Sequence, residues 1–316
     1  MTDAADRNRL TRSAALASIS VALVLVALKS WASWRTGSAA MLGSLADSAL
    51  DLVASVVTLF GVWYASQPAD REHRFGHGKA EAIAALAQVM LIALSAFGIV
   101  IRSVQEWVNG PQIAAVEEGI GVSVVAIVLT FTLLGWQRFV LARTGSVAIR
   151  TDHVHYQSDL LLNLAVIAGL ALSAYAGIAG ADPFFGIAIA AWLAWGAYEA
   201  SREALDHLMD REWPDEKRRA FVEAAAAHAE LANLHDLRTR TAGNRDFVQF
   251  HVDMPPAMTV EEAHDIIERV EADLCRKFPD MELLIHIDPA GHVDEPDNPL
   301  VEEDEFAALD EAPKPA

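Results

Sequence analysis

Long apolar segments that hold few charged residues constrain this chain more than any other feature. Six of them can be drawn before residue 209, each near the roughly 20 residues that a helix needs to cross a bilayer. They cover residues 13–34, 39–65, 80–107, 115–141, 151–178 and 183–205. Because 53% of the residues are hydrophobic, the sequence predicts that residues 1–208 form an α-helical membrane domain with six transmembrane helices.

Two of these segments carry ionisable residues four positions apart. Asp47 and Asp51 form a D-x-x-x-D pair, and His155 and Asp159 form an H-x-x-x-D pair. A spacing of four places both side chains on one helix face, and ionisable groups inside lipid are costly and usually functional. Three carboxylates and one imidazole that face a single point predict a tetrahedral site for a divalent metal ion.

The basic residues predict how the helices are oriented. Lys and Arg gather before the first segment and in alternate connections, whereas the turns near Gly110 and Gly180 have only acidic residues beside them. Since basic connections stay on the cytoplasmic side, we expect both termini to be cytoplasmic. The small residues Ala14 and Ala15 precede the apolar core of the first segment instead of following it, which favours a retained helix over a cleaved signal peptide.

Residues 209–292 differ in character and predict a small cytoplasmic α+β domain. Helical patterns alternate with strand patterns in the order αββαβ, which is that of a ferredoxin-like or metallochaperone-like fold. The predicted helices are 214–228 and 259–276, and the predicted strands are 235–241, 246–254 and 282–288. The remainder, 293–316, is acidic and contains proline, so we expect a disordered tail.

Charge and cysteine content narrow the choice of partners. The chain carries 43 acidic against 24 basic residues, and most of the excess lies after residue 208. An acidic domain repels nucleic acid and raises the local concentration of divalent cations, so nucleic acid is not an expected partner. The single cysteine, Cys275, excludes an internal disulfide and fits a reducing compartment.

Histidines single out two further regions as metal sites. In the α+β domain, imidazoles and a carboxylate on or beside the strands suit Zn²⁺, although one histidine alone would more often be structural. Those residues are His235, His251, His286 and Asp288, with His264 on the adjoining helix. The connection between the second and third segments holds Asp70, His73 and His77, which suit a metal loop or a simple charged turn. His228 and His292 are expected to be surface residues.

Three polar residues near the fifth segment receive a simpler interpretation. Asp152 and His153 are expected at its cytoplasmic start, where solvation is easy. Asn163, one turn beyond Asp159, is either a hydrogen-bond partner of the metal site or a helix-packing amide.

Five stretches together resemble the cation diffusion facilitator family, in particular its bacterial zinc/proton antiporters. They are A-D-S-A-L-D, H-R-F-G-H-G-K-A-E, H-Y-Q-S-D, H-D-L-R-T-R and I-H-I-D-P, and the resemblance extends from residue 10 to residue 290. It implies a homodimer in the bacterial inner membrane that exchanges cytoplasmic Zn²⁺ for protons by alternating access.

The resemblance also assigns residues to sites. Lys79 matches a lysine that pairs with an acid after the sixth span, here Asp210, near the dimer contact. Asp47, Asp51, His155 and Asp159 match the transport site, Asp70, His73 and His77 a loop site, and His235, His251, His264, His286 and Asp288 a cytoplasmic binuclear site with structural or regulatory Zn²⁺.

Several alternatives remain open at this stage. One imidazole with three carboxylates also accepts Cd²⁺, Fe²⁺ or Co²⁺. A membrane-bound metal sensor or a proton-coupled exporter of another cation would also use some of these residues. An intramembrane metalloprotease is disfavoured because the sequence contains no H-E-x-x-H motif.

Overall fold

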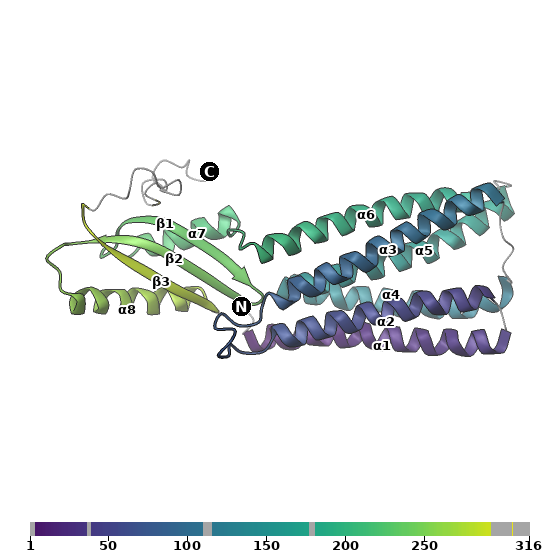
Figure 1. Ribbon diagram of the computed structural model, residues 1–316, viewed down its shortest axis with the longest axis horizontal. Helices are drawn as coiled ribbons and strands as arrows, with labels where there is room; N and C mark the ends of the chain where they lie inside the picture. The colour runs from purple at the N-terminus through teal and green to yellow at the C-terminus, as the bar shows by residue number, and fades with distance from the viewer. Residues whose placement is uncertain (1–3, 37–38, 110–115, 177–180, 292–304, 306–316) are drawn as a thin grey trace. The chain divides into compact units, whose positions relative to one another are not determined.

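The computed structural model describes residues 4–36, 39–109, 116–176, 181–291 and 305 (Figure 1). The chain divides into two compact units, Met1–Leu208 and Met209–Ala316, and each is described by itself. The prediction of a disordered tail over 293–316 lies outside the described residues, except at Glu305.

Six long helices make up the described part of the first unit. Four of them contain stretches that are long and apolar enough to cross a membrane: Asp6–Arg35, Ser44–Ala65, Ala80–Val108 and Val124–Thr144. The predicted helical membrane domain is therefore confirmed, while the count of six spans stays a prediction. The helices are α1 (Ala4–Thr36), α2 (Ala39–Ala65), α3 (Ala80–Asn109), α4 (Val116–Thr144), α5 (Val147–Ala176) and α6 (Ala181–Leu208).

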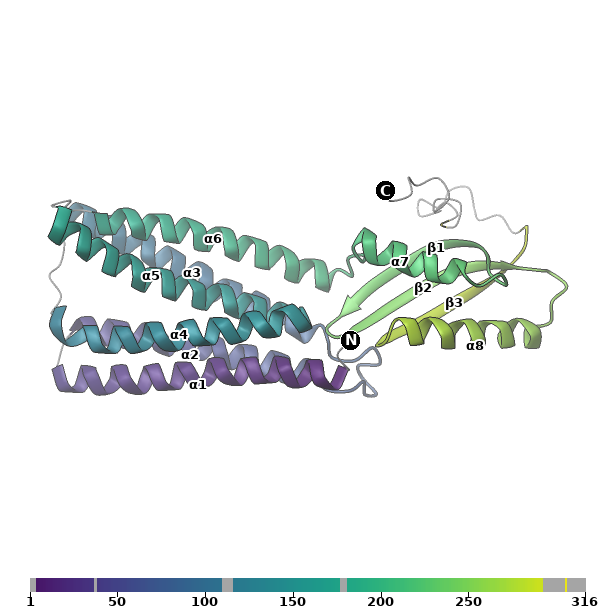
Figure 2. The ribbon, with the colours of Figure 1, turned by 180° about the vertical axis from the view of Figure 1, so that it is seen from behind.

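The helices form two groups that meet at one end of the unit. In both Figure 1 and Figure 2, α1, α2 and α4 lie along one side and α3, α5 and α6 along the other, and the groups separate away from the start of α1. We call the end where α1 starts the N-terminal end of the bundle. There Arg7 Nη2 donates to the carbonyl oxygen of Thr144 at 3.2 Å. The helix α1 starts at Ala4, before the predicted apolar segment 13–34, and this contact joins its first turns to the end of α4.

A glycine sets the distance between α2 and α3. A Cβ atom added to Gly61 would collide with the Cβ of Ala84, and a methyl carbon on an alanine cannot rotate away. By contrast, a Cβ added to Gly98 on α3 would meet no atom within 4 Å. Gly61 therefore allows α2 and α3 to pack closely, whereas Gly98 does not contribute to a close helix contact.

We expect Gly61→Ala to destabilise the protein and Gly98→Ala to leave it unchanged or slightly stabilised. Overpacking costs about 1–3 kcal/mol, whereas alanine in an open helix position gains up to about 1 kcal/mol over glycine. Thermal unfolding of both variants in the same detergent measures the difference. Equal melting temperatures would contradict the close approach at Gly61.

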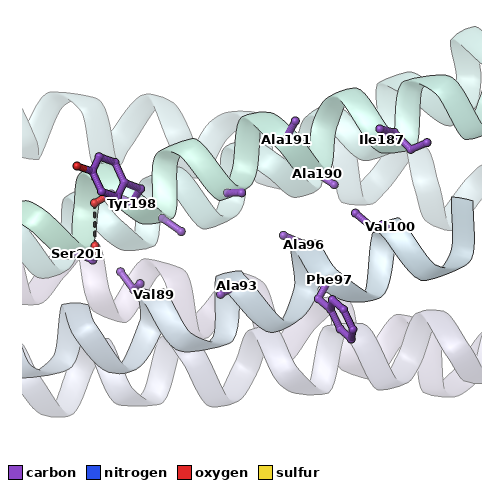
Figure 3. A pocket seen from close by; sticks show the side chains of 12 residues that line it. Val89, Ala93, Ala96, Phe97, Val100, Ile187, Ala190, Ala191, Tyr198 and Ser201 are labelled. Carbon is purple, nitrogen blue, oxygen red and sulfur yellow. Dashed lines mark hydrogen bonds between the residues drawn. The ribbon is translucent and has the colours of Figure 1, made fainter. Parts of the chain in front are cut away.

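An apolar groove of about 560 Å³ runs between α3 and α6 (Figure 3). Figure 3 shows side chains such as Val89, Ala96 and Ile187 lining it, and the Ser201 hydroxyl donates within α6 to the carbonyl oxygen of Tyr198 at 2.8 Å. The described residues that line it carry no carboxylate and no imidazole.

The second unit is a three-stranded mixed sheet with two helices. Strand β1 pairs antiparallel with β2, and β2 pairs parallel with β3, which requires the crossover that α8 provides. The predicted order αββαβ is confirmed, and each predicted element overlaps the observed one. The elements are α7 (Asp215–Ala226), β1 (Ala232–Ala242), β2 (Arg245–Met254), α8 (Val260–Lys277) and β3 (Met281–Pro289).

The core of this unit lies between the sheet and both helices. Phe221 of α7, Leu274 of α8, and Leu234 and Phe250 of the sheet are all fully buried. Along β2 every second residue from Val248 to Met254 is buried, so the residues between them belong to the other face of the sheet. Thr259 starts α8 with a capping box to Glu262.

Candidate metal sites

Asp51, His155 and Asp159 bring one ligand atom each to a single point between α2 and α5. His155 Nε2 lies 3.1 Å from Asp51 Oδ1 and 4.0 Å from Asp159 Oδ2, and the three ligand atoms lie within 4.8 Å of one another. The four-residue spacing on α5 brings His155 and Asp159 together as expected. We call these three residues the membrane group. Its carboxylate and imidazole donors suit Zn²⁺ and similar ions.

Asp47, the fourth residue predicted for this site, lies outside the membrane group. It is one turn from Asp51 on α2, and its side chain is exposed. Lys29 of α1 reaches the same stretch of α2, where its Nζ donates to Ser48 Oγ at 2.6 Å and to the carbonyl oxygen of Ser44 at 3.2 Å. An ammonium group therefore lies close to the predicted carboxylates, which the sequence interpretation did not foresee.

Asp152 is not solvated, so the expectation for it was wrong. It is fully buried, and its carboxylate accepts hydrogen bonds from three other helices that a single-helix pattern cannot reveal. His153 is half-buried and its Nδ1 lies 3.1 Å from Gln137 Oε1. Asn163 donates to the main-chain oxygen of Asp159 at 2.7 Å, so it bonds to the α5 backbone.

Asp70, His73 and His77 also form a compact ligand group, in the connection between α2 and α3. The Asp70 carboxylate lies 3.3 Å from His73 Nδ1 and 3.3 Å from His77 Nε2. It also accepts the main-chain N–H groups of His73 at 2.6 Å and Glu72 at 2.8 Å. The N–H of His73 contributes most to holding the pKa of Asp70 below its usual range. We call these three residues the loop group.

The third ligand group lies on the face of the sheet opposite the core. The strand register places His251 beside both His235 of β1 and His286 of β3. His251 Nδ1 lies 2.8 Å from Asp288 Oδ2, and His235 Nε2 lies 3.6 Å from the same oxygen. His235 Nδ1 lies 2.7 Å from the main-chain oxygen of Asn233, which leaves Nε2 as its ligand atom. We call His235, His251 and Asp288 the sheet group.

Irregular backbone in β1 aims His235 at this face. The register shifts on both sides of His235, and Asn233 and Asp236 have positive φ angles of 49° and 48°. These bulges let Leu234 and Leu237 both enter the core, although a regular strand would separate residues three apart onto opposite faces. They also bring in Asp236, which the sequence interpretation missed: its Oδ2 lies 3.6 Å from His251 Nε2.

The remaining predicted ligands lie at or beyond the edge of the sheet group. His286 Nε2 is 3.5 Å from Asp288 Oδ1, and its ring centroid is 4.5 Å from that of His251. His264 is exposed on α8, and within the described residues it does not belong to the group. Its role as a ligand stays a prediction.

Lys79 and Asp210 belong to different units, so their pairing also stays a prediction. Within the first unit, Lys79 Nζ donates to the carbonyl oxygen of Leu208 at 3.2 Å. Within the second, Arg240 Nη1 donates to Asp210 Oδ1 at 3.3 Å.

Comparison with known proteins finds a matching family for each of the two units. Residues 15–209 match the family described as cation efflux transmembrane domain, and residues 213–290 match the cytoplasmic domain of cation efflux proteins. The chain is 42% identical over 287 residues to the cation-efflux pump FieF of Pectobacterium carotovorum, covering 91% of this chain and 95% of that one. The FieF pump of Cronobacter sakazakii is 42% identical over 288 residues, covering 91% and 96%.

Among solved structures, CzrB in its Zn form is 34% identical to this chain. The match covers 27% of this chain and 99% of that one, with a TM-score of 0.24.

Proposed function

Because this chain belongs to the cation efflux family, we propose that it exports Zn²⁺ from the cytoplasm in exchange for protons. The observation that carries the proposal is the membrane group, in which Asp51, His155 and Asp159 converge between α2 and α5 of the membrane domain. Ionisable residues at such positions mark ion pathways. Cd²⁺ and Fe²⁺ suit the same donors and are the competing cargo ions.

Exchange follows from the chemistry of the ligands. A metal ion needs a neutral imidazole and ionised carboxylates, so a bound metal and bound protons exclude each other. The imidazole of His155 binds either a proton or a metal ion through the same ring nitrogen, which makes His155 the natural proton carrier. If the site faces each side of the membrane in turn, protons that enter from outside release the metal there.

The proposed setting is the bacterial inner membrane. The alternation of basic connections supports six spans with both termini in the cytoplasm. Lipid bilayer, protons and divalent metal ions are then the partners of the first unit, and a second copy of the chain is the partner of the second.

Zinc flux into proteoliposomes under an imposed pH gradient tests this proposal. We expect the native chain to move Zn²⁺ in the direction opposite to the proton flow. Cd²⁺ and Fe²⁺ should reduce the zinc flux to the extent that the protein also transports them. A folded chain that binds Zn²⁺ but shows no gradient-dependent flux would favour a metal sensor or a different cargo.

We also propose that the sheet group binds regulatory Zn²⁺ and strengthens pairing of the second units. The double variant His235→Ala/His286→Ala should lose the dependence of dimerisation on Zn²⁺, because it removes one ligand of the group and one beside it. A coupling of about 1–3 kcal/mol between Zn²⁺ binding and pairing would change the affinity of the paired units about 5- to 150-fold. Sedimentation of the full chain in detergent, with and without Zn²⁺, measures the effect, and His228→Ala serves as control.

For the loop group we expect metal affinity to fall as the pH is lowered through the range of imidazole titration. Asp70 has a lowered pKa, so its carboxylate remains ionised as the pH falls, whereas an imidazole that takes up a proton can no longer bind a metal ion. Zinc titration of the full chain carrying Asp51→Asn/His235→Ala/His286→Ala reduces the contribution of the membrane group and the sheet group, so that the loop group dominates the binding. The same titration with Asp70→Asn added should show weaker binding throughout, and binding that does not change between pH 7.5 and 5.5 would contradict the assignment of His73 and His77.

A further inference from the structure

Next to the membrane group lies a completely buried layer of polar side chains. It is one turn closer to the N-terminal end of the bundle, because α5 starts at that end and Asp152 precedes His155 by three residues. Its members are Ser18, Thr58, Gln88, Gln137 and Asp152, and none is more than 1% exposed. Each comes from a different helix, from α1 to α5.

Asp152 joins helices from both groups of the bundle. Its Oδ2 accepts Ser18 Oγ of α1 at 2.6 Å and Gln137 Nε2 of α4 at 2.8 Å. Its Oδ1 accepts Gln88 Nε2 of α3 at 2.9 Å. A single carboxylate therefore connects α3 with α1 and α4. Towards the other end of the bundle, α3 separates from α1 and α4 (Figures 1 and 2).

Neighbouring hydrogen bonds extend this layer to α2. Gln88 Nε2 also contacts Thr58 Oγ1 and lies 3.5 Å from the carbonyl oxygen of Ala54. The Tyr156 hydroxyl donates to the carbonyl oxygen of Ser18 at 3.2 Å and lies 2.9 Å from Ser55 Oγ. All five helices are thus tied together at this depth.

Exposure changes in one direction along the bundle. The side chain of Asp159 is 28% exposed and that of Asp51 16%, whereas His155 is 6% exposed and Asp152 fully buried. Asp47, one turn farther from the N-terminal end than Asp51, is exposed. The membrane group is therefore less enclosed away from the buried layer than on the side of that layer.

We propose that Asp152 is the centre of a polar latch that closes the cytoplasmic route to the membrane group. The inference rests on the proposed function, in which the N-terminal end faces the cytoplasm. Loading a metal ion from that side requires the hydrogen bonds from Gln88, Ser18 and Gln137 to break. One acceptor of the layer, Gln88 Oε1, has no partner among the described residues, so the latch is less than fully satisfied and can exchange its bonds for others.

Labelling of a reporter cysteine from each side of the membrane tests the latch. Cys275→Ser removes the single native thiol, and Asp51→Cys places one in the membrane group. A membrane-impermeant methanethiosulfonate is applied to inside-out and right-side-out vesicles. In this background we expect slow labelling from the cytoplasmic face, and Asp152→Asn should accelerate it at least about fivefold, because an amide leaves its own N–H group facing the donors that the carboxylate accepted.

Two further variants keep the test conclusive if Asp152→Asn fails to fold. Ser18→Ala removes one donor and Gln88→Leu removes another, and both should accelerate cytoplasmic labelling in the same direction as Asp152→Asn. Thr132→Val is the matched control, since Thr132 is exposed on α4 and bonds to the carbonyl oxygen of Val128 in its own helix. Its labelling rate should not change.

The latch would be overturned by rapid cytoplasmic labelling before Asp152 is changed. It would also be overturned if labelling from the cytoplasmic face were unaltered in all three latch variants, or rose only from the opposite face. Because the readout is accessibility and not flux, a failure of the latch is distinguishable from a failure of zinc/proton exchange, which the flux assay on the native chain decides.

Discussion

Asp51→Asn should reduce proton-driven zinc flux at least about hundredfold. Loss of groups that only support a metal ligand already costs about 10- to 100-fold in affinity or activity, and Asp51 is itself a member of the membrane group, with its Oδ1 3.1 Å from His155 Nε2. The amide keeps the size of the side chain but removes its negative charge. Initial rates of Zn²⁺ uptake into proteoliposomes, at matched protein content, measure the loss.

Asp47→Asn provides the comparison, because the same charge is removed one turn away. Asp47 lies outside the three converging ligands, so we expect a smaller reduction in flux than for Asp51→Asn. Equal losses in the two variants would show that all four predicted residues bind the ion together. A native rate in Asp51→Asn would refute the membrane group as the transport site.

The second large effect is expected at His155, whose replacement by alanine should separate zinc movement from the pH gradient. The ratio of zinc flux with a gradient to flux without one should fall towards one, because the carboxylates of Asp51 and Asp159 can still attract the ion while the imidazole that binds either a proton or the metal ion is gone. Measuring this ratio, and not the flux alone, separates lost coupling from lost binding.

His228→Ala is the control for this experiment. His228 lies in the second unit, and its Nε2 is 3.1 Å from Asp273 Oδ2. It therefore contacts a carboxylate that the sequence interpretation, which expected only a surface residue, did not predict. We expect its flux ratio to match that of the native chain. Equal changes in the two histidine variants would contradict the role of His155.

Membrane helices and ligand pairs could be predicted from the sequence because both depend on short, regular spacing. The apolar segment over 39–65 coincides with α2, and the i, i+4 pair His155 and Asp159 converges as that spacing requires. The predicted strands 246–254 and 282–288 likewise overlap β2 and β3, which carry His251 and His286. The bounds of each helix or strand depend on the pattern within that element alone.

Features that depend on the packing of several helices or strands could not be predicted from the sequence. The burial of Asp152 arises from donors on α1, α3 and α4, whose approach no local pattern specifies. The position of Asp47 relative to the ligands depends on how α2 meets α5. Asp236 was missed because its approach to His251 requires a bulge, and a positive φ at an aspartate has no reliable local signature.

The parallel pairing of β2 with β3 has a consequence for the order of assembly. The hairpin of β1 and β2 joins neighbours in the chain and can form early, so His235 and His251 meet as soon as that hairpin exists. Asp288 joins them only after α8 has been made and has crossed the sheet, since contacts distant in sequence close last. During synthesis from the N-terminus, β3 thus leaves the ribosome after β1 and β2, and it carries the carboxylate that completes the sheet group.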